Sequence, residues 1–160
     1  MISRFALTIT MLGVVAGCSN QPIDEPERRS VRTPIERSQT VGEHAASVAL
    51  SQVGVPYRYG GATTSGFDCS GLVQYAYSRA GKSVPRTTGQ LWSSTQAVAA
   101  RDIEVGDLLF FSIEGKMSHV GLYIGEQQFV HAPSSGRTVS VASLTSPYYS
   151  KALLRAGRPN

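Results

Sequence analysis

The sequence predicts an α+β fold in which N-terminal helices pack on an antiparallel β-sheet. Residues 41–53 and 69–80 place apolar side chains at helical spacing. From residue 108 onwards, short apolar runs alternate with turn residues, which is typical of strands. Helices followed by strands are typical of the α+β class. The 160 residues, 41% of them hydrophobic, suit one compact domain.

The first predicted helix begins at a capping box formed by Thr40 and Glu43 and ends at Gly54. A glycine-rich turn then leads into the second helix, residues 69–80, and a short third helix is expected over 89–92. The expected strands are 108–111, 117–124, 127–132, 138–141 and 152–156.

The strand histidines, His119 and His131, impose a condition on the hairpin that joins them. Strand side chains alternate between faces, so the two imidazoles share a face only if the sum of the paired residue numbers is even. We expect His119 to pair directly with His131 across a three-residue loop centred on Gly125. A two-residue turn at Gly125 and Glu126 would put the imidazoles on opposite faces.

Residues 1–17 are predicted to be an export signal. Arg4 is followed by an apolar stretch over 5–16, which is too short to span a bilayer. The stretch ends in Val15-Ala16-Gly17-Cys18, which resembles a bacterial lipobox with Cys18 as the acylated residue. The alternatives are an ordinary signal peptide with an incidental cysteine, or a short core helix.

Residues 18–40 are predicted to be a lipidated flexible tether, and residues 41–160 the folded domain. The tether segment holds three prolines, many charges and few apolar residues, so it buries too little surface to fold. Ser19, directly after the lipidation site, resembles the outer-membrane sorting pattern of Gram-negative lipoproteins. We therefore expect a chain held by lipid on the periplasmic face of the outer membrane.

Charge and cysteine content exclude some classes of protein. The formal net charge is +4 with no basic stripe, which gives nucleic-acid binding little support. Two cysteines are too few for a disulfide scaffold, and lipidation of Cys18 would leave Cys69 as the only thiol.

Cys69 enters the second helix from a glycine-rich turn, where a helix N-terminus lowers the pKa of a thiol. A thiol nucleophile needs a base, and that base needs a group that fixes its tautomer, so His119 and His131 can fill both roles. The alternatives are a buried structural cysteine and two unrelated histidines. A zinc site is disfavoured because no CxxC or HExxH pair is present.

Six motifs in order over residues 42–157 resemble the NlpC/P60 family of cysteine peptidases, which hydrolyse peptides of the bacterial cell wall. The motifs are Gly54-Val55-Pro56-Tyr57-Arg58-Tyr59-Gly60-Gly61, Phe67-Asp68-Cys69-Ser70-Gly71-Leu72-Val73, Pro85-Arg86-Thr87-Thr88-Gly89-Gln90, Gly106-Asp107-Leu108-Leu109-Phe110-Phe111, Ser118-His119-Val120-Gly121-Leu122-Tyr123 and Phe129-Val130-His131-Ala132. The resemblance implies a papain-like core.

The resemblance also implies roles for individual residues. Cys69 is the nucleophile, His119 the general base and His131 the group that orients it. The implied oxyanion and substrate-binding residues are Tyr57, Asp68, Ser70, Arg86 and Gln90. Their alternatives stay open: Tyr57 as a packing aromatic, Asp68 and Ser70 as helix caps, and Arg86 as a solvated surface cation.

The implied substrate is the stem peptide of peptidoglycan, cut at a bond to meso-diaminopimelate. Two bonds fit, the D-Ala–diaminopimelate cross-link and the γ-D-Glu–diaminopimelate bond within a stem. No metal and no cofactor are implied. The competing functions are a non-catalytic wall-binding or scaffold lipoprotein, and an acyltransferase that uses the same three residues.

Overall fold

The computed structural model describes residues 38–113 and 115–160. The predicted export signal, the lipidated Cys18 and the tether up to residue 37 lie outside these residues. In the described part, the helices are α1 (Val41–Leu50), α2 (Cys69–Arg79), α3 (Thr88–Ser94) and α4 (Pro147–Ala152), with a single 3-10 turn, η1 (Ala100–Asp102). No helix of this part is long and apolar enough to cross a membrane.

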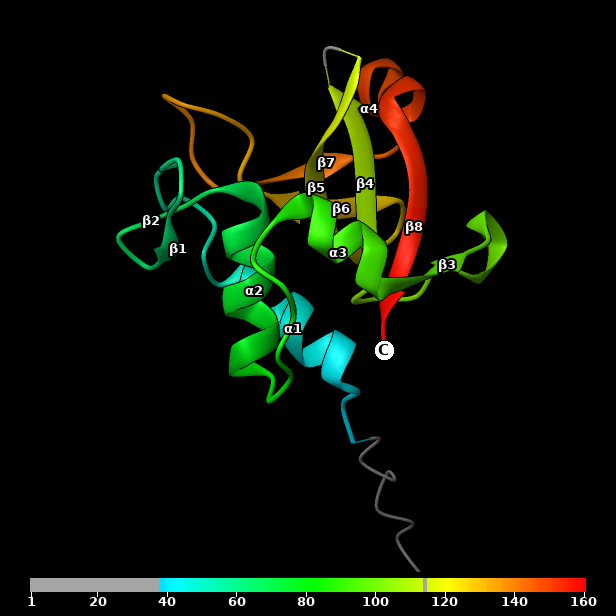
Figure 1. Ribbon diagram of the computed structural model, residues 1–160, viewed down its shortest axis with the longest axis horizontal. Helices are drawn as coiled ribbons and strands as arrows, with labels where there is room; N and C mark the ends of the chain where they lie inside the picture. The colour runs from blue at the N-terminus through cyan, green and yellow to red at the C-terminus, as the bar shows by residue number, and fades with distance from the viewer. Residues whose placement is uncertain (1–37, 114) are drawn as a thin grey trace, which may run out of the picture. The chain divides into compact units, whose positions relative to one another are not determined.

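A six-stranded antiparallel sheet forms the centre of the fold, with the strand order β3-β8-β4-β5-β6-β7 (Figure 1). Its strands are β3 (Thr95–Val98), β4 (Leu108–Ile113), β5 (Lys116–Gly125), β6 (Gln128–His131), β7 (Ser140–Ser143) and β8 (Leu153–Pro159). A separate small hairpin consists of β1 (Ala62–Thr63) and β2 (Gly66–Phe67). The predicted α+β class is confirmed.

The capping box predicted at the start of α1 is present. The Glu43 backbone N–H donates to Thr40 Oγ1 at 3.1 Å, and the Thr40 N–H donates to the Glu43 carboxylate at 2.7 Å. Two of the N–H groups that a helix N-terminus leaves without partners are satisfied in this way. The helix then buries Ala45, Ala46 and Ala49.

Both faces of the sheet are covered, so β4 is apolar on both sides. Leu108 and Phe110 pack in the cluster that includes α1 and α2, whereas Leu109 and Phe111 pack in a second cluster that includes Tyr149 of α4. In Figure 1, α1 and α2 lie apart from α4, which sits by the upper end of β4 and β8. The strands at the centre of the sheet are therefore held by packing on both faces.

The predicted register of the β5–β6 hairpin is wrong by two residues. Leu122 pairs with Val130, and the same register carried one step further places His131 opposite Gly121. His119 and His131 are therefore diagonal neighbours instead of direct partners. Because the shift is an even number, the two imidazoles still share a face, and their contact is described below.

The turn of this hairpin explains the difference. Glu126 and Gln127 form a two-residue turn with positive φ values of 50° and 57°, and Gly125 pairs with Gln128. That pairing alone would put the two histidines on opposite faces. The register shifts between Tyr123 and Gly125, and this bulge restores the even sum that the site needs.

Candidate active site

Cys69 is the first residue of α2, and the residues around it hold that helix end in place. Asp68 is the N-cap, and its Oδ1 accepts a hydrogen bond of 2.7 Å from the Gly71 N–H. Gly71 lies so close to the glycine-rich turn that an added Cβ would meet the Gly61 carbonyl oxygen at 2.0 Å. The turn and the helix therefore pack backbone to backbone directly beside the thiol.

The Cys69 thiol lies against strand β5. Its Sγ is 3.9 Å from the Ser118 carbonyl oxygen and 3.8 Å from Thr88 Oγ1 on α3. Burial raises the pKa of Cys69, and hydrogen bonds from Thr88 and the Val120 backbone N–H oppose that rise only in part. The lowered pKa expected from the helix N-terminus is therefore not the net outcome, and the thiol is neutral at pH 7.

His119 and His131 contact each other in the interior. His119 Nε2 and His131 Nδ1 are 2.8 Å apart, and the residues are only 7% and 2% exposed. Burial lowers the pKa of His119 to about 4 and, with the neighbouring His119 and Arg137, that of His131 to about 3. Both rings are neutral at pH 7, which leaves one proton on each ring.

The Cys69 thiol contacts the backbone of the strand that carries His119, and not the His119 ring. Among the described residues, Cys69 Sγ lies within hydrogen-bond distance of Thr88 Oγ1 and of the Ser118 carbonyl, and the Val120 N–H also donates to it, but no hydrogen bond joins it to the His119 ring. Ser118 directly precedes His119, so the thiol lies beside the strand segment that carries the imidazole. Catalytic hydrogen bonds of this kind commonly tighten only once substrate binds.

Tyr149 of α4 contacts the far side of the histidine pair. Its Oη lies 3.5 Å from His131 Nε2. If Nε2 of His131 carries the proton and faces this hydroxyl, then its Nδ1 accepts from Nε2–H of His119. Nδ1 of His119 is then left without a proton, and this is the tautomer that a base requires.

Arg86 and Asp68 form an ion pair next to Cys69. The guanidinium donates to both carboxylate oxygens, at 2.9 Å and 2.7 Å, and to Ser70 Oγ at 2.9 Å. Burial alone would raise the pKa of Asp68, but Arg86 and the N–H groups of Gly71 and Gly60 hold it below its ordinary value. The three predicted substrate-binding residues are thus gathered into one bonded cluster.

The two other predicted binding residues lie apart from that cluster. Tyr57 is half-buried, and its backbone N–H donates to the Arg137 carbonyl at 2.8 Å. Burial, and then the charge of Cys69, raise the pKa of the Tyr57 phenol. Gln90 is exposed, and its side chain completes the capping box of α3 by accepting from Thr87.

Comparison with known proteins identifies the fold family of this arrangement. The model of the NlpC/P60 family matches residues 54–158, which is more than half of the chain. The chain belongs to the NlpC/P60 family. The domain is also similar to a crystal structure of an NlpC/P60 family protein from Bacillus cereus, with a TM-score of 0.69 and 31% identity over 73% of this chain and 39% of that one.

Two curated relatives of this NlpC/P60 chain are named as peptidases, and the name of the second includes murein. The γ-D-glutamyl-L-lysine dipeptidyl-peptidase of Bacillus subtilis is 34% identical over 82% of this chain and 45% of its own length. The murein DD-endopeptidase MepH of Escherichia coli is 36% identical over 71% of this chain and 44% of its own length. The chain therefore spans less than half the length of these relatives.

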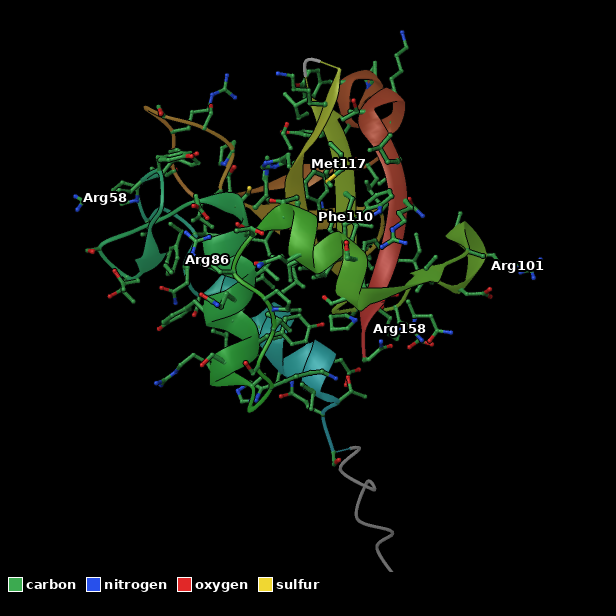
Figure 2. All side chains as sticks on the ribbon, viewed as in Figure 1. Arg58, Arg86, Arg101, Phe110, Met117 and Arg158 are labelled. Carbon is green, nitrogen blue, oxygen red and sulfur yellow. The ribbon has the colours of Figure 1, made fainter. Side chains whose placement is uncertain are left out.

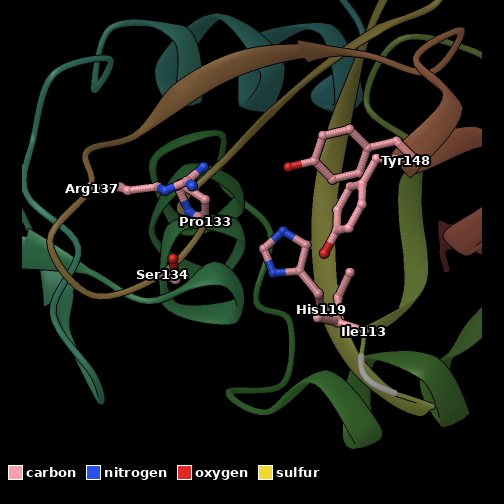
Figure 3. Close-up of a pocket in the computed structure, with 7 residues that line it drawn as sticks. Ile113, His119, Pro133, Ser134, Arg137 and Tyr148 are labelled. Carbon is pink, nitrogen blue, oxygen red and sulfur yellow. The ribbon is translucent and has the colours of Figure 1, made fainter.

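Four residues at the NlpC/P60 site were not found by sequence reasoning: Thr88, Arg137, Tyr148 and Tyr149. With His119 and others, the last three line a cavity of about 490 Å³ (Figure 3). A signal for α4 was present, because Ser146 followed by Pro147 has the form of an N-cap and first helical residue. The loop that carries Arg137 has no comparable signature.

Metal-binding side chains are not clustered in the described ranges. Within residues 38–113 and 115–160, no group of three or more His, Cys, Asp or Glu side chains is placed so that it could hold a metal ion.

Proposed function

We propose that this NlpC/P60 domain is a cysteine peptidase that hydrolyses peptidoglycan peptides at a bond to meso-diaminopimelate. The observation that carries the proposal is the buried contact of 2.8 Å between His119 and His131, next to the strand residue that Cys69 touches. A base whose tautomer is fixed by a third group is what a thiol nucleophile requires. The names of the two relatives support the wall peptide as substrate.

In the proposed mechanism the Cys69 sulfur attacks the amide carbonyl while His119 takes the thiol proton. His131 holds the imidazole through their hydrogen bond. The Cys69 backbone N–H and the Tyr57 hydroxyl stabilise the oxyanion, and each such donor contributes about 100- to 1,000-fold in rate. The His119 imidazolium then protonates the leaving amine, and water, activated by the same imidazole, hydrolyses the thioester.

The neutral resting pair shapes this sequence of steps. Burial raises the pKa of the Cys69 thiol and lowers that of His119 to about 4, so the proton crosses to His119 only as the sulfur attacks. A bound substrate that brings Sγ within reach of the imidazole is then part of the catalytic step. Asp68 and Arg86 anchor the helix end against which the substrate lies.

Two bonds remain candidates, and the names of the relatives divide between them. One relative is named for a γ-D-glutamyl bond and the other as a DD-endopeptidase. In peptidoglycan of the diaminopimelate type, the γ-D-Glu–diaminopimelate bond and the D-Ala–diaminopimelate cross-link both release an amine of diaminopimelate. The acyl side differs between the two bonds, whereas the leaving residue is the same.

Digestion of defined muropeptides tests the activity and identifies the bond. We expect the wild-type chain to cleave one of the two bonds, and Cys69→Ala to release no product. Equal inactivity of both proteins on cross-linked and uncross-linked substrates and on whole sacculi would favour a wall-binding or scaffold protein instead. Product masses that carry an added amine acceptor in place of water would favour an acyltransferase.

We further propose that Cys18 carries the lipid that holds the domain at the periplasmic face of the outer membrane. The lipobox-like residues 15–18 and Ser19 support this location. Incorporation of labelled palmitate into the wild-type chain but not into Cys18→Ala, with recovery of the label in outer-membrane fractions, is the expected result. Label in the inner membrane alone would contradict the sorting proposal.

A further inference from the structure

A cavity opens beside His119. Its lining comes from four parts of the chain: Ile113 on β4, His119 on β5, Ser134 and Arg137 in the loop after β6, and Tyr148 and Tyr149 on α4. In Figure 3, Arg137 and Tyr148 stand on opposite sides of the opening, with His119 between them. The volume of about 490 Å³ is enough for an amino-acid side chain.

Arg137 gives this cavity a positive charge that none of the described residues neutralises. In the described ranges, Arg137 has neither an ion pair nor a side-chain hydrogen bond, whereas Arg86 and Arg158 are each bound to an aspartate. None of the residues that line the cavity is Asp or Glu. A guanidinium at the rim of a cavity is suited to a carboxylate supplied from outside.

The backbone holds the base of Arg137 in a fixed place. Its N–H donates to the Ser134 carbonyl at 3.2 Å, and its own carbonyl accepts from the Tyr57 N–H at 2.8 Å. Two residues further on, Val139 exchanges hydrogen bonds with Val55 and Gly54. The loop is therefore fastened to the segment that carries Tyr57, and only the side chain of Arg137 is left to reorient.

The cavity lies on the leaving-group side of the proposed reaction. The acyl half of the substrate becomes attached to Cys69, which does not line the cavity, whereas His119, which protonates the departing amine, does. With either candidate bond, that amine belongs to diaminopimelate. This residue differs from lysine by the carboxylate on its D-centre, and that carboxylate stays free in both cases.

We propose that Arg137 binds the D-centre carboxylate of diaminopimelate and makes this cavity the specificity site for the leaving residue. The inference rests on the proposed peptidase function. Tyr148, 60% exposed and packed edge-on against Tyr149, supplies an apolar wall for the methylene chain. In the γ-D-Glu bond the reacting amine is on the L-centre, so the guanidinium meets the carboxylate at the far end of that chain. In the cross-link the reacting amine and the carboxylate share the D-centre, so the guanidinium meets the carboxylate next to the departing amine.

The test compares two substrates that differ only in this carboxylate. Matched muropeptides carry either meso-diaminopimelate or L-lysine at the leaving position, and kcat/KM is measured for each. We expect wild type to favour diaminopimelate by about 10- to 100-fold, which is the range of a charge-assisted hydrogen bond. Arg137→Gln should lose that preference because kcat/KM falls for the diaminopimelate substrate alone. Arg137→Lys should show a preference between those of wild type and Arg137→Gln.

Arg101→Gln is the matched control. Arg101 is 87% exposed, pairs only with its neighbour Asp102, and points into solvent on the far side of the molecule from Arg58 and Arg86 (Figure 2). This variant also removes one positive charge but should leave both substrates unchanged. An equal fall for Arg101→Gln and Arg137→Gln would mean that only net charge matters, which would overturn the proposal.

The two proposals fail in different ways. If wild type cleaves neither substrate, the peptidase function is wrong. If wild type cleaves both and Arg137→Gln lowers them equally, or lowers neither, the peptidase stands and the carboxylate site is overturned. The lysine substrate is also an internal control. Any effect of Arg137 on the histidine pair would change kcat/KM equally for both substrates and would cancel in their ratio.

Discussion

Nε2 of His119 and Nδ1 of His131 lie 2.8 Å apart in a part of the sheet that is almost closed to solvent. If His131 carries its proton on Nε2, the contact leaves Nδ1 of His119 as the nitrogen of this pair that can accept a proton from a thiol. It is made possible by a bulge in β5 that keeps both rings on one face. The backbone of one hairpin thus determines how the two imidazoles meet.

Replacing His131 tests the requirement for an acceptor at this point. His131→Asn offers a carbonyl oxygen to His119 Nε2–H, whereas His131→Leu offers none. We expect His131→Leu to lose about 10²- to 10⁴-fold in kcat, as happens when an orienting group is removed, and His131→Asn to retain much more. Equal losses in the two variants, with both folded by circular dichroism, would contradict an orienting role.

Tyr149→Phe tests the next contact outwards. The variant keeps the ring that packs on Phe111 and Phe129 but removes the hydroxyl 3.5 Å from His131 Nε2. We expect kcat to fall by about 10-fold with KM unchanged, because outer partners of this kind typically contribute 10- to 100-fold. Thermal unfolding is the control, since an unchanged midpoint shows that the packing is intact. An unchanged kcat would mean that the hydroxyl has no part in setting the tautomer.

The protonation of the resting site can be measured directly. Because burial raises the pKa of Cys69 and lowers that of His119 to about 4, the site should hold a neutral thiol at pH 7. The ultraviolet difference spectrum of wild type minus Cys69→Ser should show no thiolate band at this pH. Activity should fall as the pH drops through about 4, where His119 becomes protonated and can no longer accept. A full thiolate band at pH 7 would indicate an ion pair instead.

The buried histidines also predict how stability depends on pH. The pKa of His131 is about 3 in the folded chain against about 6.5 when unfolded, so acid protonates the unfolded state first. The contribution of the neutral His131 to the free energy of unfolding is therefore fully present above pH 6.5 and is lost as the pH drops below it. Between pH 7 and 5, one such histidine costs about 2 kcal/mol. Urea titrations should show a smaller fall for His131→Asn than for wild type, and parallel falls would contradict this account.

How much of this was accessible from the sequence differs from element to element. The start of α1 was predicted because a capping box is local, with Thr40 and Glu43 three residues apart. The entry into α2 at Cys69 was predicted for the same reason, from a glycine-rich turn followed by apolar spacing. Strand β3 was missed, because it buries only Thr95 well and its partner β8 lies some 60 residues away in the sequence.

The residues of the candidate site also differ in whether a local sequence pattern marks them. Cys69, His119 and His131 stand in recognisable motifs, and a parity argument about the strands correctly kept the two rings on one face. The register itself was mispredicted, since the bulge between Tyr123 and Gly125 has no marker in the sequence. Arg137 and Tyr149 approach the site only through the loop after β6 and helix α4, and such tertiary contacts leave no local pattern.

Gly71 offers a last prediction about why the residue two positions after the nucleophile is a glycine. An alanine there would place Cβ 2.0 Å from the Gly61 carbonyl oxygen and 3.0 Å from Asp68 Oδ1. The contact at 2.0 Å is with a backbone oxygen and not with a flexible side chain, so the backbone itself must move. We expect Gly71→Ala to cost at least about 3 kcal/mol in the free energy of unfolding, comparable to overpacking a tight core.

Gly89→Ala is the matched control for this change. Gly89 is also in the first turn of a helix, α3, but it is exposed, and no atom lies within 4 Å of an added Cβ. Alanine loses less chain entropy than glycine in a helix, so Gly89→Ala should be neutral or should stabilise by up to about 1 kcal/mol. Chemical denaturation of both variants measures the difference. If the two substitutions had equal effects, the contact of α2 with the glycine-rich turn would not be what positions Cys69.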